Sequence, residues 1–370
     1  MSQAKICGFA ASAVICALLL TVGCAELAEE TTKPRIEPEE TTEAKVEREE
    51  ATERNIEPEE IVKAEVEPEE HKPTIKLALK FTPGDLTTYK VTKENERSVI
   101  WGGPLTSKPK GFTGGHSGNR LEMTFIQRIQ NVDDQGNAVA EITIKGLKYL
   151  AKVKDNIVLD FDSSREKDRN SPLFKLIGQS YTIKITPSGQ ISKVIDVSGA
   201  RAAVEGSASD NKRAARLLST EVIKDQHSIP ALPAAEKNQL RRDDNWSSIK
   251  TFSFDWMGSK TYEKIYTLKE IKDIDGRRIA IIEMSAIPSS EKAKELHKEQ
   301  VTGFFSKLFD TTEIYTGELR LDLTAGEVEQ YFEEFRSEWV AVDLMAPEED
   351  KEPDTLRMGA TRLYHIERID

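Results

Sequence analysis

From residue 75 onward, apolar and polar residues alternate in short runs, which is the period of a β-strand with one buried face. Ile75, Leu77 and Leu79 begin the pattern. Similar runs recur at residues 121–125, 142–144, 157–159, 181–185, 252–256, 279–281 and 319–323. Their alternation, rather than a continuous apolar run, predicts antiparallel strands that bury one face.

Short turn sequences separate these runs. They lie at residues 133–137, 187–189, 275–276 and 324–326, and each contains a glycine. Glycine readily adopts the positive φ that tight hairpins need. Because tight turns join antiparallel neighbours, the pattern predicts a β-meander.

Helical spacing is confined to a few segments. Residues 210–225 place Ala214, Leu217, Leu218 and Val222 on one face, behind possible caps at Ser207, Ser209 and Asp210. Residues 290–309 predict a second helix and residues 173–177 a short one. Two prolines in residues 229–233 break the helical pattern, and a strand pattern resumes near Trp246.

The same order of parts occurs twice along the chain, with long strands, a hairpin and a later strand pair in each half. We therefore predict a mainly β (α+β) fold. Two similar antiparallel β-meander units form a sandwich or a curved open barrel, with a few helices between and after them. The first unit spans residues 73–197, a helical connector 198–242 and the second unit 243–370. Residues 73–370 are expected to form one packed region.

The first 23 residues are typical of a signal peptide, with Lys5, an apolar stretch over residues 6–22, and Gly23 before Cys24. The run Leu-Thr-Val-Gly-Cys at residues 20–24 resembles the lipobox of bacterial lipoproteins, although Thr21 stands three positions before the cysteine. The resemblance implies cleavage after Gly23 and lipidation of Cys24 with further acylation, such as palmitate. Ala25 after the cysteine implies export to the outer membrane. A plain secretory signal and a retained membrane span are the alternatives.

Residues 24–72 predict a disordered tether. From Glu29 the chain repeats every ten residues around a Glu pair, with too few large apolar residues to offset the entropy of ordering. Residues 25–72 hold 18 Glu against 7 Lys and Arg, a net charge of −11 out of −12 for the chain. With +1 from the signal peptide, about −2 remains for residues 73–370. A nearly neutral domain argues against nucleic acid as a partner.

The domain also resembles a family. The segments LKFTPGD, GNAVAEITIKGL, DDNW and TGELRLDLTAG are similar to those of an uncharacterised family of exported β-rich bacterial proteins of unknown function. The resemblance covers about residues 75–343 and implies the fold and the export. It implies no catalytic residue and no ligand.

Candidate chemistry is sparse. The five histidines (His71, His116, His227, His297 and His365) lack metal spacing, and Cys24 is the only cysteine after the signal peptide. Ser117 follows His116, but Asn119 stands where a nucleophile elbow needs glycine. Asp160 and Asp162 share a strand face, which is more typical of solvated charges than of a cation site. We predict no catalytic residue, no metal and no cofactor.

One set of residues indicates a ligand groove. Phe252, Phe254 and Trp256 share one strand face. With three further aromatic residues, Trp101, Trp246 and Tyr262, they are the candidates for an apolar groove. Core and rim packing is the alternative interpretation of the same residues.

These observations predict a non-enzymatic envelope lipoprotein whose tethered β domain binds or scaffolds an unknown envelope ligand or protein. The membrane is its partner through the N-terminal lipid. A lipid or lipoprotein carrier with a half-barrel apolar cavity is the first alternative, and an envelope hydrolase the second. A filled core would favour a scaffold, an open cavity a carrier, and a cleft joining His116 or His227 to a carboxylate an enzyme.

Overall fold

The computed structural model describes residues 74–102, 113–254, 258–289, 309–342 and 355–369. The signal peptide, Cys24 and the decapeptide repeats lie outside the described residues, as do Trp256 and nearly all of the helix expected at 290–309. The chain divides into two units, Met1–His71 and Lys72–Asp370, and the fold below is that of the second. No helix among the described residues has the length and apolar character needed to cross a membrane.

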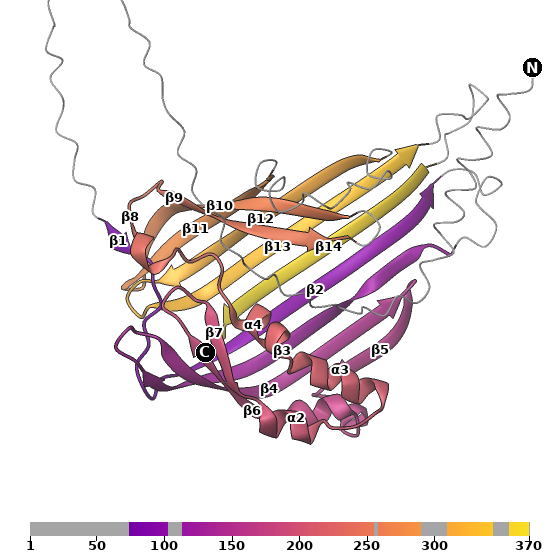
Figure 1. Ribbon diagram of the computed structural model, residues 1–370, viewed down its shortest axis with the longest axis horizontal. Helices are drawn as coiled ribbons and strands as arrows, with labels where there is room; N and C mark the ends of the chain where they lie inside the picture. Colours follow the sequence, from indigo (N-terminus) through magenta and orange to yellow (C-terminus); the bar gives the residue numbers. More distant parts are fainter. Residues whose placement is uncertain (1–73, 103–112, 255–257, 290–308, 343–354, 370) are drawn as a thin grey trace, which may run out of the picture. The chain divides into compact units, whose positions relative to one another are not determined.

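One large antiparallel sheet of 12 strands dominates the second unit (Figure 1). Its strand order is β7-β6-β4-β3-β2-β14-β13-β12-β11-β10-β9, with β5 paired to β4. The first meander consists of β2 (Leu86–Gly102), β3 (Gly115–Val132), β4 (Ala138–Val153), β5 (Asn156–Asp162), β6 (Ser180–Ile185) and β7 (Ile191–Asp196). The second consists of β9 (Asn245–Ser253), β10 (Ser259–Ile274), β11 (Arg277–Pro288), β12 (Asp310–Asp322), β13 (Glu327–Val342) and β14 (Thr355–Arg368).

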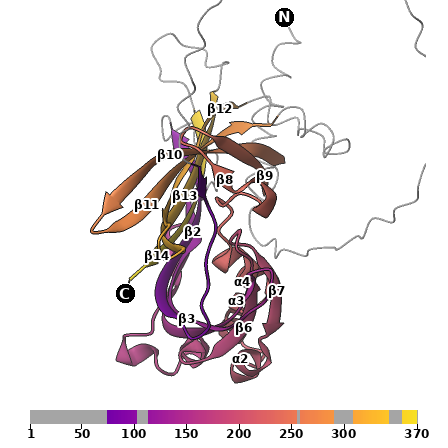
Figure 2. The ribbon, with the colours of Figure 1, turned by 90° about the vertical axis from the view of Figure 1, so that its left-hand side faces the viewer.

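The two meanders join edge to edge through β2 and β14, which pair from Tyr89↔Arg368 to Gly102↔Thr355. β7 and β9 end the path of described strands and do not pair with each other, so the sheet is not closed. Figure 2 shows it curving, with α3 and α4 on the inner side of the curve. The predicted mainly β fold with two antiparallel meanders is confirmed. Of its two expected forms, the continuous hydrogen bonding matches the curved open barrel.

The predicted turns form hairpins. Asp275 and Gly276 have φ values of 50° and 75°, so both central residues of the β10–β11 turn are left-handed, as a two-residue hairpin turn requires. Gly326, with φ of 73°, closes the β12–β13 turn. A Cβ there would lie 2.5 Å from the Lys80 Cβ, and Lys80 N donates to Gly326 O at 2.9 Å. The glycine thus lets the N-terminal segment cross this end of the sheet.

The connector consists of short elements that cover the inner face of the sheet. They are α2 (Ser198–Ala203), α3 (Ser209–Leu217), α4 (Thr220–His227), the 3-10 helix η3 (Ala235–Lys237) and β8 (Gln239–Leu240), which pairs with β1 (Ile75–Lys76). Two further 3-10 helices, η1 (Glu166–Asp168) and η2 (Pro172–Leu176), follow β5, and η2 matches the short helix expected at 173–177.

The single helix expected over residues 210–225 is two helices. Ser219 has extended backbone, and its side chain accepts a hydrogen bond from Val222 N at 3.2 Å. A serine in this position caps a new helix, so α4 starts at Thr220 in a new direction. The apolar periodicity runs through the break because both helices contribute buried residues, including Leu217 of α3 and Ile223 of α4.

The core lies between the connector and the inner face. An apolar row crosses the sheet at the level of Tyr331. It consists of Leu268, Ile282, Leu319, Tyr331, Ile366, Val91, Met123 and Leu147, each on the inner face of its strand and all buried. The neighbouring row toward Phe252 carries charged groups, among them Glu333 and Lys93. The connector does not fill the space above these charged groups.

Candidate functional site: a cavity beneath the connector

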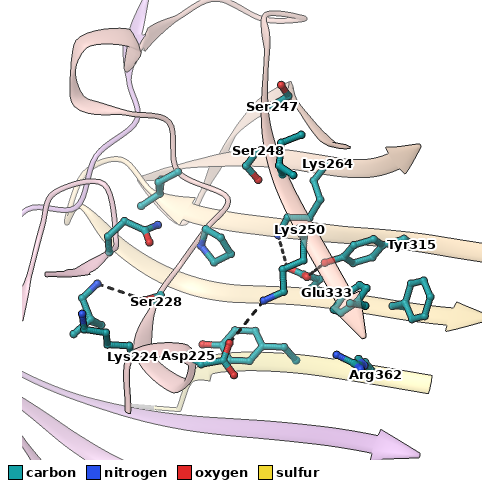
Figure 3. Close-up of a pocket in the computed structure, with 18 of the residues that line it drawn as sticks. Lys224, Asp225, Ser228, Ser247, Ser248, Lys250, Lys264, Tyr315, Glu333 and Arg362 are labelled. Atoms are coloured by element: carbon teal, nitrogen blue, oxygen red, sulfur yellow. Dashed lines mark hydrogen bonds and ion pairs between the residues drawn. The ribbon is translucent and has the colours of Figure 1, made fainter. Parts of the chain in front are cut away.

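A cavity of about 840 Å³ lies between the connector and the inner face of the second meander (Figure 3). One wall comes from α4, residues 228–234 and the turn between β6 and β7. The other comes from β9, β10, β12, β13, β14 and the adjoining β2. Sites for small molecules usually enclose about 300–1,000 Å³. The cavity therefore has the size of a ligand site.

Part of the cavity wall is aromatic. Phe252 on β9 lies 4.9 Å from Phe335 and 5.5 Å from Tyr315 between ring centroids, and all three line the cavity. Such tilted pairs are favourable arrangements of aromatic rings. At the other end, Trp246 stacks on Tyr266 at 5.8 Å and donates from Nε1 to Ala231 O at 3.2 Å. That hydrogen bond ties the edge strand β9 to the connector.

The structure brings part of the predicted groove together. Trp246 and Phe252 line the cavity. Phe254 and Tyr262 belong to the same aromatic cluster but are packed behind it, with 7% and 1% of their surfaces exposed. Trp101 lies near the distant end of β2 and does not line the cavity. The groove interpretation thus describes Trp246 and Phe252, and the core interpretation describes Phe254 and Tyr262. Ligand binding by the groove residues stays a prediction.

Sequence reasoning missed Tyr315 and Phe335, the partners of Phe252. They come from β12 and β13, which lie 63 and 83 residues further along the chain by their numbers. Their alternation with polar neighbours marks each as inward facing. Only the sheet order places them opposite Phe252, since the period of a strand does not identify its partner.

A buried ionic network forms one side of the cavity. Lys264 Nζ lies 3.1 Å from Glu333 Oε2, and the hydroxyls of Tyr315 and Tyr331 also donate to the Glu333 carboxylate. The Lys264 side chain is 3% exposed and that of Glu333 14%. Burial acts to lower the pKa of Lys264, but the charge of Glu333 outweighs it and holds this pKa above its usual value. Burial and Glu333 together raise the pKa of Tyr331 well above its usual value. The network is therefore an ammonium and a carboxylate held by neutral phenols.

A second charged group lies nearer the connector. Asp225 on α4 forms an ion pair with Lys93 on β2. It also lies 4.0 Å from Lys250 on β9 (Figure 3). Burial acts to raise the pKa of Asp225, but the positive charges of Lys93, Lys250 and Arg362 hold it below its usual value. Five basic and three acidic side chains line the cavity: Lys93, Lys224, Lys250, Lys264, Arg362, Glu221, Asp225 and Glu333. The lining is therefore net positive.

His227 lies below the cavity in the core. Its Nε2 is 2.7 Å from Tyr181 Oη, and its ring packs edge-on against Phe125 with centroids 4.7 Å apart. Burial, aided by the charge of Lys93, lowers the pKa of His227 from 6.5 to about 3. Since its ring partner is a phenol and not a carboxylate, this arrangement is structural rather than one expected of a general base.

The low pKa of His227 predicts that the folded protein loses stability in mild acid. Below pH 6.5 the unfolded chain takes up a proton that the folded chain takes up only near pH 3, so stability falls across that window. Between pH 7 and pH 5 we expect a loss of about 2 kcal/mol, measured by urea unfolding at both values. His227→Gln should remove most of this slope, whereas His116→Gln, at an exposed hairpin, should retain it. Equal slopes in all three proteins would contradict the prediction.

His116 does meet a carboxylate, as the hydrolase alternative requires. Its Nδ1 lies 2.9 Å from Asp155 Oδ1, which also accepts from His116 N at 3.1 Å. Asp155 has φ of 67° in the β4–β5 turn, so the pair holds this turn against β3. Ser117 points to the other face of the strand, and its Oγ accepts from Lys154 N at 2.8 Å. The three residues therefore do not share one face as a nucleophile, a base and an orienting acid would.

The predicted carboxylate pair of β5 has local partners. Asp160 binds Arg165 at 3.0 Å, and Asp162 accepts from Ser164 Oγ at 2.7 Å. These hydrogen bonds hold the pKa of each carboxyl below its usual value. Across the described ranges, no group of three or more His, Cys, Asp or Glu side chains is arranged to hold a metal ion.

Comparison with known proteins gave structural matches but no match by sequence. No protein-family model matches the sequence, and no curated protein does. A solved structure described as lipid-protein interactions in lipovitellin aligns with 79% of this chain at 10% sequence identity and a TM-score of 0.39. The aligned part is 26% of that protein, so this chain spans about a quarter of its length. A likeness of this size defines neither the function nor the ligand of the present chain.

Fold and site together define a class: a mainly β protein with a ligand-sized, net-positive cavity between an open antiparallel sheet and a helical connector.

Proposed function

We propose that this protein is a non-enzymatic lipoprotein of the bacterial envelope whose β domain binds an amphipathic small molecule in the cavity beneath the connector. The cavity carries the proposal, because an aromatic wall and basic side chains line the same space. An apolar chain or ring gains from contact with Phe252, Tyr315 and Phe335. A polar end gains from the charged groups near α4.

Ser248 supports binding of a molecule that offers a hydrogen bond. It lines the cavity from β9, and its Oγ is buried without a hydrogen-bond partner among the described residues. Ser248 stands directly opposite Lys264 in the β9–β10 ladder. Buried hydroxyls are normally paired, so a ligand in the cavity supplies the missing partner in this proposal.

The lipid-carrier alternative is the more specific form of the same proposal. It is favoured by the aromatic wall and by the open curvature of the sheet. A carrier needs an open cavity, whereas a scaffold would have a filled core, and the cavity volume of about 840 Å³ favours the carrier.

The hydrolase alternative has less support. A hollow of about 220 Å³ is lined by Glu94, Glu96, His116 and Ser117. However, the ring of His116 pairs with Asp155, and Ser117 Oγ accepts a hydrogen bond from Lys154 N, so the described contacts do not join the serine to the histidine.

Filling the cavity tests the proposal. In Ser248→Trp, the indole is expected to occupy the cavity and abolish binding without removing a charge. The assay uses the full chain in a neutral detergent with a photoreactive hexadecanoic acid. Covalent labelling is measured by mass spectrometry, and labelled peptides are mapped to the cavity strands. Ser253→Trp is the matched control, because Ser253 is exposed on the opposite face of β9.

We expect saturable labelling of the natural protein and of the Ser253→Trp variant. The Ser248→Trp variant should lose labelling by at least about tenfold, because the indole would block the contact between the acyl chain and the cavity wall. Circular dichroism and a melting curve verify that both variants fold. Absence of saturable labelling in the natural protein, or equal labelling of folded Ser248→Trp, would refute a ligand site here.

Anchoring is a separate proposal that rests on the sequence around Cys24. With Cys24→Ala, lipidation is expected to be lost completely, because no other cysteine follows the signal peptide. Cells are labelled with a radioactive fatty acid and fractionated. Ser12→Ala, within the signal peptide, is the control and should retain the label. Uptake of label by the Cys24 variant, together with its recovery in the membrane fraction, would exclude lipid attachment at this cysteine.

A further inference from the structure

β9 is an end strand of the sheet, so one of its edges has no neighbouring strand among the described residues. Its other edge pairs with β10. Just before β9, Leu268 N donates to Asp244 O at 3.1 Å, and just after it, Phe254 N donates to Gly258 O at 2.8 Å. Because bonded and non-bonded pairs alternate in an antiparallel ladder, the odd-numbered residues of β9 direct their backbone N–H and C=O away from β10.

This free edge of β9 borders the cavity. Residues 246–250 all line the cavity, although their side chains point alternately to the two faces of the strand. The backbone between the two sets of side chains must therefore border the same space. Near the end of the strand, Arg362 of the cavity wall donates to Ser253 O at 3.0 Å. One outward carbonyl thus already accepts a hydrogen bond from inside the domain.

The connector treats the two end strands of the sheet differently. At the start of β7, Ile191 N donates to Ser228 Oγ of the connector at 3.4 Å. Within the described ranges, the backbone of β9 forms no hydrogen bond with the connector. The connector wall of the cavity includes Pro230 and Pro233, which have no N–H to donate. The outward backbone groups of β9 are therefore left for another partner.

An extended main chain is the partner that fits such an edge. Strand edges bind peptides by continuing the ladder of the sheet. Ser247 and Ile249 each offer one N–H and one C=O, and these two positions are ~7 Å apart along the strand, which a peptide of about three residues spans. A second copy of this chain does not fit, because its own β9 edge would lie against its own cavity.

The same strand leads to the aromatic wall. Phe252 lies on the inward face of β9, with ring centroids 4.9 Å from Phe335 and 5.5 Å from Tyr315. From Ile249 to Phe252 the strand advances by ~10 Å. An apolar chain attached to the end of a peptide at Ile249 therefore reaches this wall.

We propose that the ligand of the cavity is an acylated peptide. Its main chain adds to the sheet as a short strand beside Ser247 and Ile249, and its acyl chain lies against the wall of Phe252, Tyr315 and Phe335. This inference rests on the proposed function and names the ligand class of the same cavity. Since main-chain groups are common to all peptides, the site accepts peptides of different sequence.

The test measures competition against photoreactive hexadecanoic acid, with the full chain in neutral detergent. The competitor is N-hexadecanoyl-Ser-Val-Ser-Val-Ser amide. A second competitor is the same molecule methylated at every amide nitrogen, which keeps the acyl chain but has no main-chain donor. A third is the N-acetyl peptide, which keeps the donors but has no long chain.

Ile249→Pro is the variant that tests the edge. It removes an N–H that points away from β10, at the kind of edge position where proline is tolerated. Ile249→Val is the matched control, because it keeps the N–H and a branched side chain. Circular dichroism and a melting curve verify the fold of both variants. If Ile249→Pro does not fold, the methylated and unmethylated peptides on the natural protein decide the case.

We expect the acylated peptide to compete at least about tenfold more strongly than its methylated form, because several main-chain hydrogen bonds are lost together. Ile249→Pro should weaken the acylated peptide by about fivefold, the factor for one net hydrogen bond, and leave labelling by the acid itself unchanged. Ile249→Val should match the natural protein in both measurements.

Equal competition by the acylated peptide and its methylated form overturns pairing with β9, while labelling by the acid leaves the proposed function in place. Equal competition by the acylated and acetylated peptides overturns the acyl-chain part. A dimer in light scattering that Ile249→Pro abolishes would assign the edge to a second copy and overturn the proposal. Absence of saturable labelling by the acid removes the proposed function, and this inference with it.

Discussion

Replacement of Glu333 by Ala is expected to lower the free energy of unfolding by about 3–5 kcal/mol. The substitution leaves the Lys264 ammonium, whose side chain is 3% exposed, without its carboxylate at 3.1 Å. It also removes the acceptor of the Tyr315 and Tyr331 hydroxyls. A buried charge without a counter-ion costs more than the pair contributes, because its desolvation is no longer compensated. Urea unfolding followed by circular dichroism measures the change.

A double-mutant cycle separates the charge from the loss of contacts. Lys264→Met alone and Glu333→Ala with Lys264→Met complete the cycle, since the double variant leaves neither member of the buried ion pair. We expect the double variant to be more stable than Glu333→Ala. Glu334→Ala is the control, because Glu334 stands next along β13, on the opposite face, where it pairs with Arg336. A loss below about 1 kcal/mol in Glu333→Ala, the level of an exposed ion pair, would contradict a buried network.

Replacement of Phe335 by Ala is expected to cost about 3–5 kcal/mol, the range for a large aromatic residue lost from a core. Phe335 is 1% exposed and lies within 5.6 Å, between ring centroids, of Phe252, Phe254, Tyr262 and Tyr315. Its removal opens a void at the centre of the aromatic cluster that four neighbouring rings cannot fill without leaving their own contacts. Denaturant unfolding again gives the magnitude.

Phe332→Ala is the matched control, because Phe332 lies on the same strand but faces outward, with the ring of His365 at 6.4 Å. It should cost about 1 kcal/mol, the typical effect of a substitution outside the core. Similar losses for Phe332→Ala and Phe335→Ala would show that the two faces of β13 are equally buried, and the assigned inner face would be wrong.

The strands and turns could be predicted from the sequence because their signals are local. Alternation at residues 181–185 corresponds to β6, and Asp275 with Gly276 corresponds to the left-handed turn between β10 and β11. The division of residues 210–225 into α3 and α4 was missed, because apolar periodicity continued across Ser219. A capping serine inside a helical pattern was the available signal.

The site was predictable only in part. Phe252 and Trp246 share the inward face of β9, and this sharing follows from the two-residue period of a strand. Trp101 is also inward facing by register, yet it pairs with Leu356 at the far end of β2, outside the cavity. Aromatic character alone does not give the position of a residue along the length of the sheet.

By itself, the sequence determined the mainly β character, the hairpin positions, the break after α4, and the prediction of a lipid-bearing N-terminus, because each depends on residues close together in the chain. Only the tertiary structure decided that β2 pairs with β14, that Tyr315 and Phe335 meet Phe252, and that Asp225 faces Lys93. These contacts join residues that are far apart in the chain. The separation is 63 positions for Phe252 and Tyr315 and 279 positions for Tyr89 and Arg368. A strand pattern specifies which face is buried, whereas the choice of partner depends on the free energy of packing the whole sheet against its connector.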